Sequence, residues 1–147
     1  PKFVDICRLK NKSAIHSNCD SLPFEDEIFD YAIAISVFHH LSTNSRRLNA
    51  IGEMIRVVKP GGEMVFNMWS VENQNKRSFT KGDNLVPWTS RPKKNVETQI
   101  YERYYHVFDE STIHTFVKEV LSKFNVNVIH VFNEKGNWVV IMVKKFY

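Results

Sequence analysis

The sequence predicts an α/β domain whose first half is strand, helix and strand and whose end is an antiparallel hairpin. Residues 31–37 form an uninterrupted apolar run with β-branched members, which is typical of a parallel strand covered on both faces. An amphipathic stretch follows it, and residues 63–69 are predicted as the next strand. Two short runs, 126–132 and 138–143, close the chain. The strand–helix–strand order of the first half predicts a right-handed parallel arrangement. The two closing strands form a hairpin, which adds an antiparallel edge to the sheet.

The first elements have recognisable ends. Residues 4–9 look like the end of a helix, and 14–19 are predicted as a short strand. Ser42 or Thr43 can cap the central helix. Its apolar positions recur at three- and four-residue spacing, at Leu48, Ile51, Ile55 and Val58. Pro60-Gly61-Gly62 then stops the helix.

The second half starts with a long irregular stretch. Residues 70–98 are polar and contain Pro87 and Pro92, so we expect a loop, and loops of this length are usually functional or disordered. Asp109 or Ser111 can cap a second helix. Its apolar positions are Ile113, Phe116, Val117, Val120, Leu121 and Phe124.

Composition limits the class of protein. With 147 residues and 43% hydrophobic content, the chain can form one core and suits one domain. The net charge of +4 lies entirely in residues 71–147, which permits a polyanionic partner without requiring one. The longest apolar run, 31–38, is far shorter than the roughly 20 residues that cross a bilayer. Two cysteines without a CxxC motif favour free thiols in a reducing compartment, here the cytoplasm.

Several motifs resemble the middle of a class I S-adenosylmethionine-dependent methyltransferase. They are the turn Cys19-Asp20-Ser21-Leu22-Pro23-Phe24, the strand that Phe29-Asp30 opens, the sequence Val37-Phe38-His39-His40-Leu41 and the sequence Lys59-Pro60-Gly61-Gly62. In that family the acidic turn faces the adenine, and the strand after it ends beneath the methyl group. The resemblance implies a Rossmann-like sheet that ends in an antiparallel hairpin. It also implies S-adenosylmethionine as cofactor, bound by Asp20, Ser21, Leu22, Ser36 and Val37.

One family feature is missing. Such domains begin with a strand and a Gly-x-Gly turn around the methionine end of the cofactor, and none of the five glycines forms this turn. We therefore expect one methyltransferase domain, 1–147, without its N-terminal βαβ unit. We expect these residues alone to bind S-adenosylmethionine weakly or not at all, with strand edges left unpaired.

A closer resemblance covers almost the whole chain. The sequences Val37-Phe38-His39-His40-Leu41-Ser42-Thr43 with Arg46-Arg47, Asn84-Leu85-Val86-Pro87-Trp88, Arg103-Tyr104-Tyr105-His106-Val107-Phe108 and Gly136-Asn137-Trp138 are similar to the tRNA wobble-uridine carboxymethyl methyltransferases. That family esterifies 5-carboxymethyluridine at the anticodon wobble position. The resemblance implies tRNA as partner, together with a small zinc-containing activator protein that pairs along a sheet edge, here residues 14–19.

The expected chemistry depends on binding and orientation. A carboxylate is already ionised near neutral pH, so its methylation needs no general base. We predict His40 and Arg103 as catalytic, because the second histidine is usual in the parent pattern and arginine can hold a carboxylate or phosphate with two bonds. Aromatic side chains, Tyr105 among them, can stack on an unpaired base. The predicted substrate-binding residues are Trp69, Trp88, Tyr104, His106, Asn137 and Trp138.

Structural alternatives exist for these residues. Asp20 can cap a turn, one histidine of the pair can be packed, and Trp138 can belong to the core. Arg103 can pair with Glu102 or Asp109 on the surface. No metal site is predicted, because the histidines and cysteines lack short-spaced ligand pairs on one element.

The alternative function is a non-catalytic RNA- or protein-binding module that has lost the cofactor loop. The residues upstream of Pro1 in the full-length protein would discriminate, because a strand followed by Asp-x-Gly-x-Gly favours the enzyme.

Overall fold

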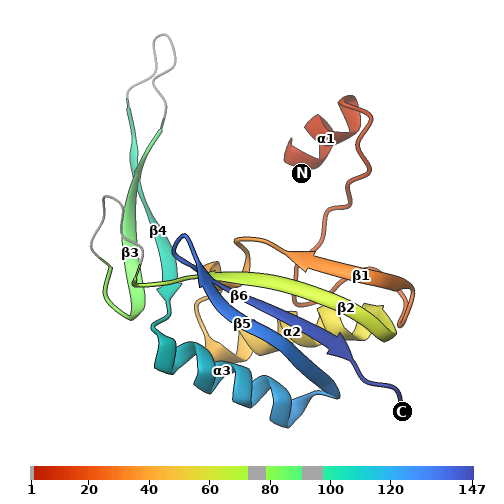
Figure 1. Cartoon of the computed structure of the whole chain (residues 1–147). Helices are drawn as coiled ribbons and strands as arrows, with labels where there is room; N and C mark the ends of the chain where they lie inside the picture. Colours follow the sequence, from red (N-terminus) through yellow and green to blue (C-terminus); the bar gives the residue numbers. More distant parts are fainter. Residues whose placement is uncertain (1, 73–78, 91–97) are drawn as a thin grey trace.

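The chain forms a four-stranded sheet with two long helices on one face and a separate two-stranded arm (Figure 1). The computed structural model describes residues 2–72, 79–90 and 98–147. Its strands are β1 (Phe29–Ala34), β2 (Val58–Trp69), β3 (Gly82–Thr89), β4 (Ile100–Val107), β5 (Val126–Glu134) and β6 (Asn137–Lys144). Its helices are α1 (Lys2–Leu9), α2 (Asn44–Val57), α3 (Glu110–Lys123) and the short 3-10 helix η1 (Phe38–His40).

The sheet has the order β1-β2-β6-β5. β1 and β2 are parallel and are joined through α2, whereas β6 runs antiparallel to both β2 and β5. The predicted α/β sheet with a closing antiparallel hairpin is therefore confirmed. The carboxyl ends of β1 and β2 meet at one end of the sheet, and their amino ends meet at the other.

Helix caps fix where the two long helices begin. The Oγ1 of Thr43 accepts a hydrogen bond from the N–H of Arg46 at 3.2 Å, so Thr43 is the cap of α2. Asp109 caps α3 through a reciprocal pair of bonds with Thr112, and these bonds hold the pKa of the Asp109 carboxyl well below its usual range. Of the alternatives that the sequence left open, Thr43 and Asp109 are the caps.

The core lies between the sheet and the two long helices. Its fully buried side chains include Phe38, Ile51, Met64, Phe66, Ile113 and Val140. Gly62 lets the starts of β1 and β2 approach closely. A Cβ at Gly62 would lie only 2.7 Å from the carbonyl oxygen of Asp30 and 2.5 Å from Cγ1 of Val58.

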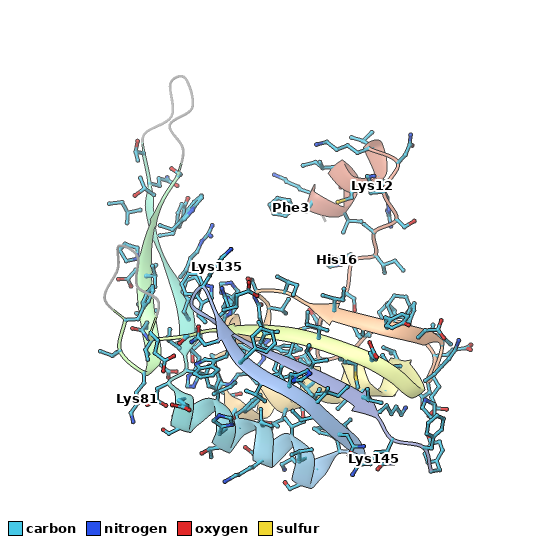
Figure 2. The ribbon with its side chains drawn as sticks, viewed as in Figure 1. Phe3, Lys12, His16, Lys81, Lys135 and Lys145 are labelled. Atoms are coloured by element: carbon cyan, nitrogen blue, oxygen red, sulfur yellow. The ribbon has the colours of Figure 1, made fainter. Side chains whose placement is uncertain are left out.

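The opposite face of the sheet is open over β1. Tyr31 and Ile33 are 70% and 72% exposed, while Ala32 and Ala34 pack against the core. The prediction that this strand is covered on both faces is therefore wrong for the part of the chain that the structure describes. The physical reason is that α1, which has no buried residue, stands away from the sheet, as the place of Phe3 shows (Figure 2).

Residues 14–19 do not form the predicted strand. Within them, only Asn18 makes a bridge, and its partner is the nearby Ser21. A strand is stable when another strand pairs with it, and no described strand lies alongside this segment. The predicted docking edge for an activator protein is therefore not formed at residues 14–19.

The arm replaces much of the predicted loop at residues 70–98. β3 lies inside that range and pairs antiparallel with β4, from Gly82 opposite Val107 to Thr89 opposite Ile100. The prediction of a loop was wrong here, because Pro87 was taken to exclude a strand. A two-stranded ribbon leaves one edge of each strand without a partner, and proline is tolerated there. Residues 73–78 and 91–97 of the predicted loop lie outside the described residues.

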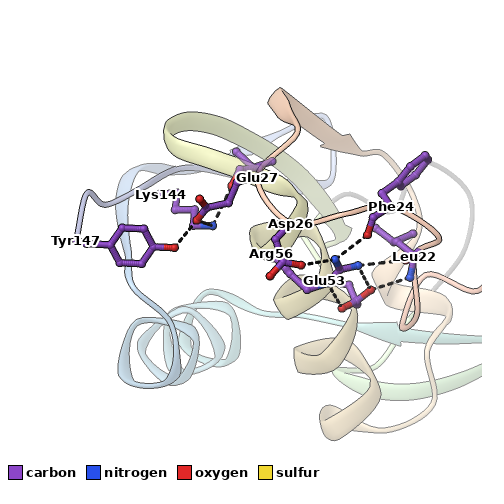
Figure 3. A network of polar contacts seen from close by, with 9 residues as sticks. Leu22, Phe24, Asp26, Glu27, Glu53, Arg56, Lys144 and Tyr147 are labelled. Atoms are coloured by element: carbon purple, nitrogen blue, oxygen red, sulfur yellow. Dashed lines mark hydrogen bonds and ion pairs between the residues drawn. The ribbon is translucent and has the colours of Figure 1, made fainter.

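A network of polar contacts ties the amino end of the sheet together (Figure 3). Arg56, near the end of α2, donates to the carboxylates of Glu53 and Asp26 at 2.7 Å. It also donates to the carbonyl oxygens of Leu22 and Phe24, at 3.1 and 2.7 Å. The turn before β1 is thereby held against α2.

Lys144 fixes the end of β6 to the same region. Its ammonium is almost fully buried and donates to the carbonyl oxygen of Val58 and to Oε1 of Glu27, both at 2.9 Å. The hydroxyl of Tyr147 also bonds to Glu27. The hydrogen bonds from Tyr147 and then Lys144 lower the pKa of the Glu27 carboxyl.

Candidate functional site

The candidate site lies at the carboxyl ends of β1 and β2, the end at which parallel α/β sheets bind ligands. After β1 the chain turns at Ser36, which has a φ of 57°, a left-handed conformation that is uncommon outside glycine. The N–H of Ser36 donates to Oδ1 of Asn67 on β2 at 2.6 Å. This bond fixes the turn to the neighbouring strand and leads the chain into η1, which carries His39 and His40.

His39 is fully buried and neutral. Its Nδ1 accepts a hydrogen bond from the backbone N–H of Trp69 at 3.3 Å, so its proton sits on Nε2. Burial, and to a lesser extent the charge of neighbouring His40, lowers the pKa of His39 to about 3. The Nε2 has no hydrogen-bond partner among the described residues. A buried donor in that state costs about 1–3 kcal/mol, which marks it as a group that can meet a ligand or a water.

His39, His40, Trp69 and Tyr105 make up what we call the aromatic cluster. The ring of Tyr105, from β4, stacks on Trp69 with centroids 4.2 Å apart and planes 11° from parallel. Tyr105 also contacts His40, with centroids 4.5 Å apart. The exposed His40 donates from Nδ1 to the carbonyl oxygen of Tyr104 at 3.2 Å. The cluster therefore joins the sheet to the base of the arm and presents His40 to solvent.

The other face of the arm carries a polar group centred on Asp83. Its Oδ1 lies 2.5 Å from Oη of Tyr104 and 2.6 Å from Nδ1 of His106. The bonds from Tyr104 and then His106 lower the pKa of Asp83. Burial lowers the pKa of His106 by more than the bond to Asp83 raises it, so a neutral ring donates to a carboxylate. The Tyr104 hydroxyl and Nδ1 of His106, two groups predicted to bind substrate, thus both contact Asp83, and the Tyr104 hydroxyl also lies 3.1 Å from the carbonyl oxygen of Ser42.

Arg47, from α2, supports the chain just after η1. It is 4% exposed, and its Nη1 donates to the carbonyl oxygen of Leu41 at 2.7 Å. Its guanidinium lies 5.9 Å from the ring centroid of Phe108. Its Nε has no partner within the described ranges. Two buried N–H donors therefore lack a hydrogen-bond partner among the described residues. One is on His39, in the segment that follows β1, and the other is on Arg47, in α2.

Comparison with known proteins decides the family. The family profile described as a methyltransferase domain matches residues 1–66. A crystal structure of an S-adenosylmethionine-dependent methyltransferase from Clostridium acetobutylicum ATCC 824 aligns with a TM-score of 0.66 at 9% identity, over 97% of this chain and 69% of that chain. This chain is a class I S-adenosylmethionine-dependent methyltransferase domain. The family implies S-adenosylmethionine as the cofactor.

Several of its sequence relatives are named as tRNA methyltransferases. The chain is 28% identical over 194 aligned residues to the tRNA (carboxymethyluridine(34)-5-O)-methyltransferase alkbh8 of Xenopus tropicalis, covering 97% of this chain and 30% of the relative. It is 47% identical over 86 residues to the probable tRNA methyltransferase 9B of Homo sapiens, covering 58% of this chain and 19% of the relative. The methyltransferase domain thus spans about a third or less of the length of these relatives.

The residues present fit the adenine end of the cofactor. A cavity of about 200 Å³ between β1 and α2 is walled by apolar side chains that include Leu22 and Val37, two predicted cofactor residues. The carboxylate of Asp20, next to the cavity-lining Cys19, lies 3.7 Å from Nε of Arg46 and keeps part of its surface open. Apolar walls suit a flat ring, and a carboxylate can accept a bond from an exocyclic amino group. No Gly-x-Gly turn for the methionine end occurs in the sequence.

Two further predicted cofactor residues lie in turns. Ser21 shares a bridge with Asn18, and its carbonyl oxygen accepts a bond from the hydroxyl of Ser17 at 2.8 Å. Ser36 is held by Asn67, as described above. Both positions therefore belong to turns whose backbone is fixed within the chain.

Arg103 and Trp88 lie together on the arm rather than in the aromatic cluster. The guanidinium of Arg103 stands 4.1 Å from the ring centroid of Trp88. No ion pair joins Arg103 to Glu102 or Asp109 within the described ranges, and Asp109 instead pairs with Lys81 at 3.4 Å. Because side chains alternate along a strand, Arg103 shares a face with Tyr105 and lies about 7 Å farther out.

Of the two predicted substrate-binding residues at the start of β6, Asn137 lies at the candidate site, whereas Trp138 lies in the core. Trp138 is 6% exposed, and its Nε1 donates to the carbonyl oxygen of Phe108 at 3.3 Å, so it is a core residue rather than the predicted base-stacking residue. Asn137 pairs across the sheet with Trp69, which places it beside the aromatic cluster. Lys135 lies at the same turn (Figure 2).

Sequence reasoning missed three residues of the site. Asn67 carries a signal, because it is a polar residue within an otherwise apolar strand. Asp83 carries no distinctive signal, and Arg47 stands out only as part of the Arg46-Arg47 pair in the family resemblance, which assigns it no role. Their roles depend on contacts with Tyr104, His106 and Leu41 that the folded chain creates.

Proposed function

We propose that the protein containing this methyltransferase domain transfers a methyl group from S-adenosylmethionine to the carboxylate of 5-carboxymethyluridine at the wobble position of a tRNA. The observation that carries the proposal is the aromatic cluster at the carboxyl ends of β1 and β2, in which the exposed His40 packs on the buried ring of Tyr105, which in turn stacks on Trp69. An unpaired base can stack against an exposed histidine ring that is supported in this way. The relatives that are named as tRNA methyltransferases support the same substrate class.

The protonation states at the site suit this reaction. When bound, S-adenosylmethionine supplies an electrophilic methyl group on its sulfonium. The uridine carboxylate is ionised near neutral pH and needs no base. His39, with a pKa of about 3, serves as a neutral N–H donor rather than as a base. The task of the chain is to orient the substrate oxygen and to exclude water, and His40 and the aromatic rings provide the surfaces for this.

The direct test uses the full-length protein with a labelled methyl donor and tRNA that contains 5-carboxymethyluridine. We expect label to enter the wobble nucleotide as a methyl ester, which mild alkali releases. The control is the same tRNA with unmodified uridine at that position, and it should take up no label. No transfer to the modified tRNA would contradict the proposed activity.

The cofactor assignment is tested at Asp20. Asp20→Ala should weaken S-adenosylmethionine binding about 5- to 150-fold, because a hydrogen bond to a charged acceptor contributes about 1–3 kcal/mol. Isothermal calorimetry on the full-length protein measures it, and RNA affinity should change less. The matched control is Glu25→Ala, an exposed carboxylate in the same segment with no ion pair among the described residues. Equal loss of cofactor and RNA affinity would instead give Asp20 a structural role in its turn.

The second candidate, a non-catalytic binding module, is favoured by the absence of a Gly-x-Gly turn from the sequence and by the exposed outer side chains of β1. The two candidates differ in one measurable property. Full-length protein that binds S-adenosylmethionine with micromolar affinity supports the enzyme, whereas RNA binding without cofactor binding supports the module. We expect residues 1–147 alone to bind the cofactor weakly or not at all.

We place the enzyme in the cytoplasm, and we keep a small zinc-containing activator as its proposed partner. The location rests on the two free cysteines, and the activator rests on the family resemblance alone. The edge strand expected to receive the activator is not formed at residues 14–19. Co-purification of the full-length protein with a zinc-containing partner would test the assembly.

A further inference from the structure

The arm exposes aromatic side chains beyond the point where it packs. At its base, Val86, Tyr105 and Val107 are buried together. Farther out, Trp88 is 37% exposed and Tyr101 is 50% exposed. Exposed aromatic rings on a projecting ribbon are costly to leave in water, so they point to a contact surface.

The pairing register divides the arm into two faces. Cross-strand partners share a face, and side chains alternate along each strand. One face therefore carries the pairs Asn84–Tyr105, Val86–Arg103 and Trp88–Tyr101, and we call it the stacking face. The other face carries the pairs Asp83–His106, Leu85–Tyr104, Pro87–Glu102 and Thr89–Ile100.

Charge separates the two faces. The stacking face has Arg103 and no acidic residue, whereas the other face has Asp83 and Glu102 and no lysine or arginine. Arg103 has no carboxylate partner among the described residues, and its guanidinium carbon lies over the Trp88 ring, 4.1 Å from the ring centroid. A guanidinium stacked in this way keeps its in-plane N–H groups available to an anionic acceptor.

The stacking face is continuous with the candidate site. Tyr101 and Trp88 contact each other with centroids 6.0 Å apart, Arg103 covers Trp88, and Tyr105 follows two residues farther in. Tyr105 in turn stacks on Trp69. The distance along β4 from Tyr101 to Tyr105 is about 14 Å, which a short stretch of extended single strand can follow.

From these observations, and on the basis of the proposed function, we infer that the stacking face is a second binding site for single-stranded RNA. Trp88 and Tyr101 stack on an unpaired base that neighbours the methylated nucleotide, while Arg103 donates to its phosphate or base edge. An aromatic and cationic surface without acidic side chains suits RNA, which supplies planar rings and phosphate acceptors together. An apolar protein surface would bury Arg103 without an acceptor, which is unfavourable.

The test measures RNA affinity of the full-length protein with a fluorescent single-stranded oligouridine and with a duplex of equal length. We expect the parent to prefer the single strand. Trp88→Ala should lose about 5- to 150-fold in single-strand affinity, the range for one aromatic–base stack. Arg103→Lys keeps the charge but not the planar stack, so it should lose most of the preference for the single strand.

Controls keep the test specific. Leu85→Ala removes an exposed apolar side chain from the other face and should bind RNA within about twofold of the parent. Thermal melting by circular dichroism checks that every variant is folded. Unchanged RNA affinity in Trp88→Ala, or an equal loss in Leu85→Ala, would overturn the inference and favour a protein partner. The proposed function fails separately, through the absence of methyl transfer by the parent protein.

Discussion

The two ends of the four-stranded sheet differ in how the hydrogen-bonding groups of their side chains are satisfied. At the amino ends of β1 and β2, Arg56 is bonded to Glu53 and Asp26, and Lys144 is bonded to Glu27 (Figure 3). At the carboxyl ends, Nε2 of His39 has no partner among the residues that the structure describes. Buried polar groups are normally satisfied, so each exception calls for an explanation.

The difference separates stability from function. The amino-end network joins the turn before β1, helix α2 and the last strand, so its bonds act to hold elements together. At the carboxyl end, the unpaired N–H of the neutral His39 and the aromatic rings lie beside the exposed His40. This arrangement can bind a ligand, but it lowers the stability of the ligand-free protein. Substitutions at one end at a time therefore allow the effects on stability and on ligand binding to be compared.

The largest expected effect is a pH dependence that comes from His39. Its pKa is about 3 in the folded chain against an ordinary value of 6.5, so between these values the unfolded chain binds the extra proton. Its contribution to stability is complete above about pH 6.5 and is lost as the pH falls toward 3. The slope should reach about 1.4 kcal/mol of unfolding free energy per pH unit.

Urea unfolding of the full-length protein between pH 7 and pH 5 measures this slope. His39→Gln should reduce it, because glutamine does not titrate, whereas His130→Gln, an exposed histidine on β5, should leave it unchanged. The pKa values of Glu27 and Glu53 are also lowered, but these carboxylates affect stability at lower pH. Their contribution to stability is present above about pH 4.5 and is lost as the pH falls further. A slope above pH 5 that persists in His39→Gln would contradict the assignment.

The next effect is on methyl transfer. His40→Ala should lower kcat/KM for the modified tRNA about 100-fold, because a small misplacement of a bound substrate costs that much. His40 is exposed, and within the described ranges its side chain makes one hydrogen bond, to a carbonyl oxygen of β4, so the melting temperature should change little. The control is His114→Ala on α3, an exposed histidine outside the aromatic cluster. Equal activity of the two variants would remove His40 from the site.

Much of the fold could be predicted from local sequence. The apolar run that became β1, the Thr43 and Asp109 caps and the closing hairpin each depend on residues close together in the chain. The arm was missed because the pairing of β3 depends on β4, which comes later in the chain, and because Pro87 was taken as a sign of a loop. Residues 14–19 were predicted as a strand, but only Ile15 among them is β-branched and no described strand pairs with them.

The site was predictable only in outline. The sequence shows two adjacent histidines but not which of them is buried, because that depends on Trp69 and Tyr105, which approach from distant positions. Tyr105 comes from a strand more than sixty residues away, and its face is set by the register of the arm. Arg103 looked suited to a carboxylate, but its side chain lies over Trp88, which no local pattern indicates.

The smallest expected effect tests the amino end alone. Lys144→Ala removes a buried ammonium that bonds the carbonyl oxygen of Val58 and the carboxylate of Glu27, so the free energy of unfolding should fall by about 1–3 kcal/mol. The matched control is Lys145→Ala, an exposed neighbour, for which a change within about 0.5 kcal/mol is expected. Both variants should keep the RNA and cofactor affinities of the parent, because Lys144 lies at the end of the sheet away from the aromatic cluster. If Lys144→Ala instead weakened ligand binding without lowering stability, the division between a structural and a ligand-binding end of the sheet would be wrong.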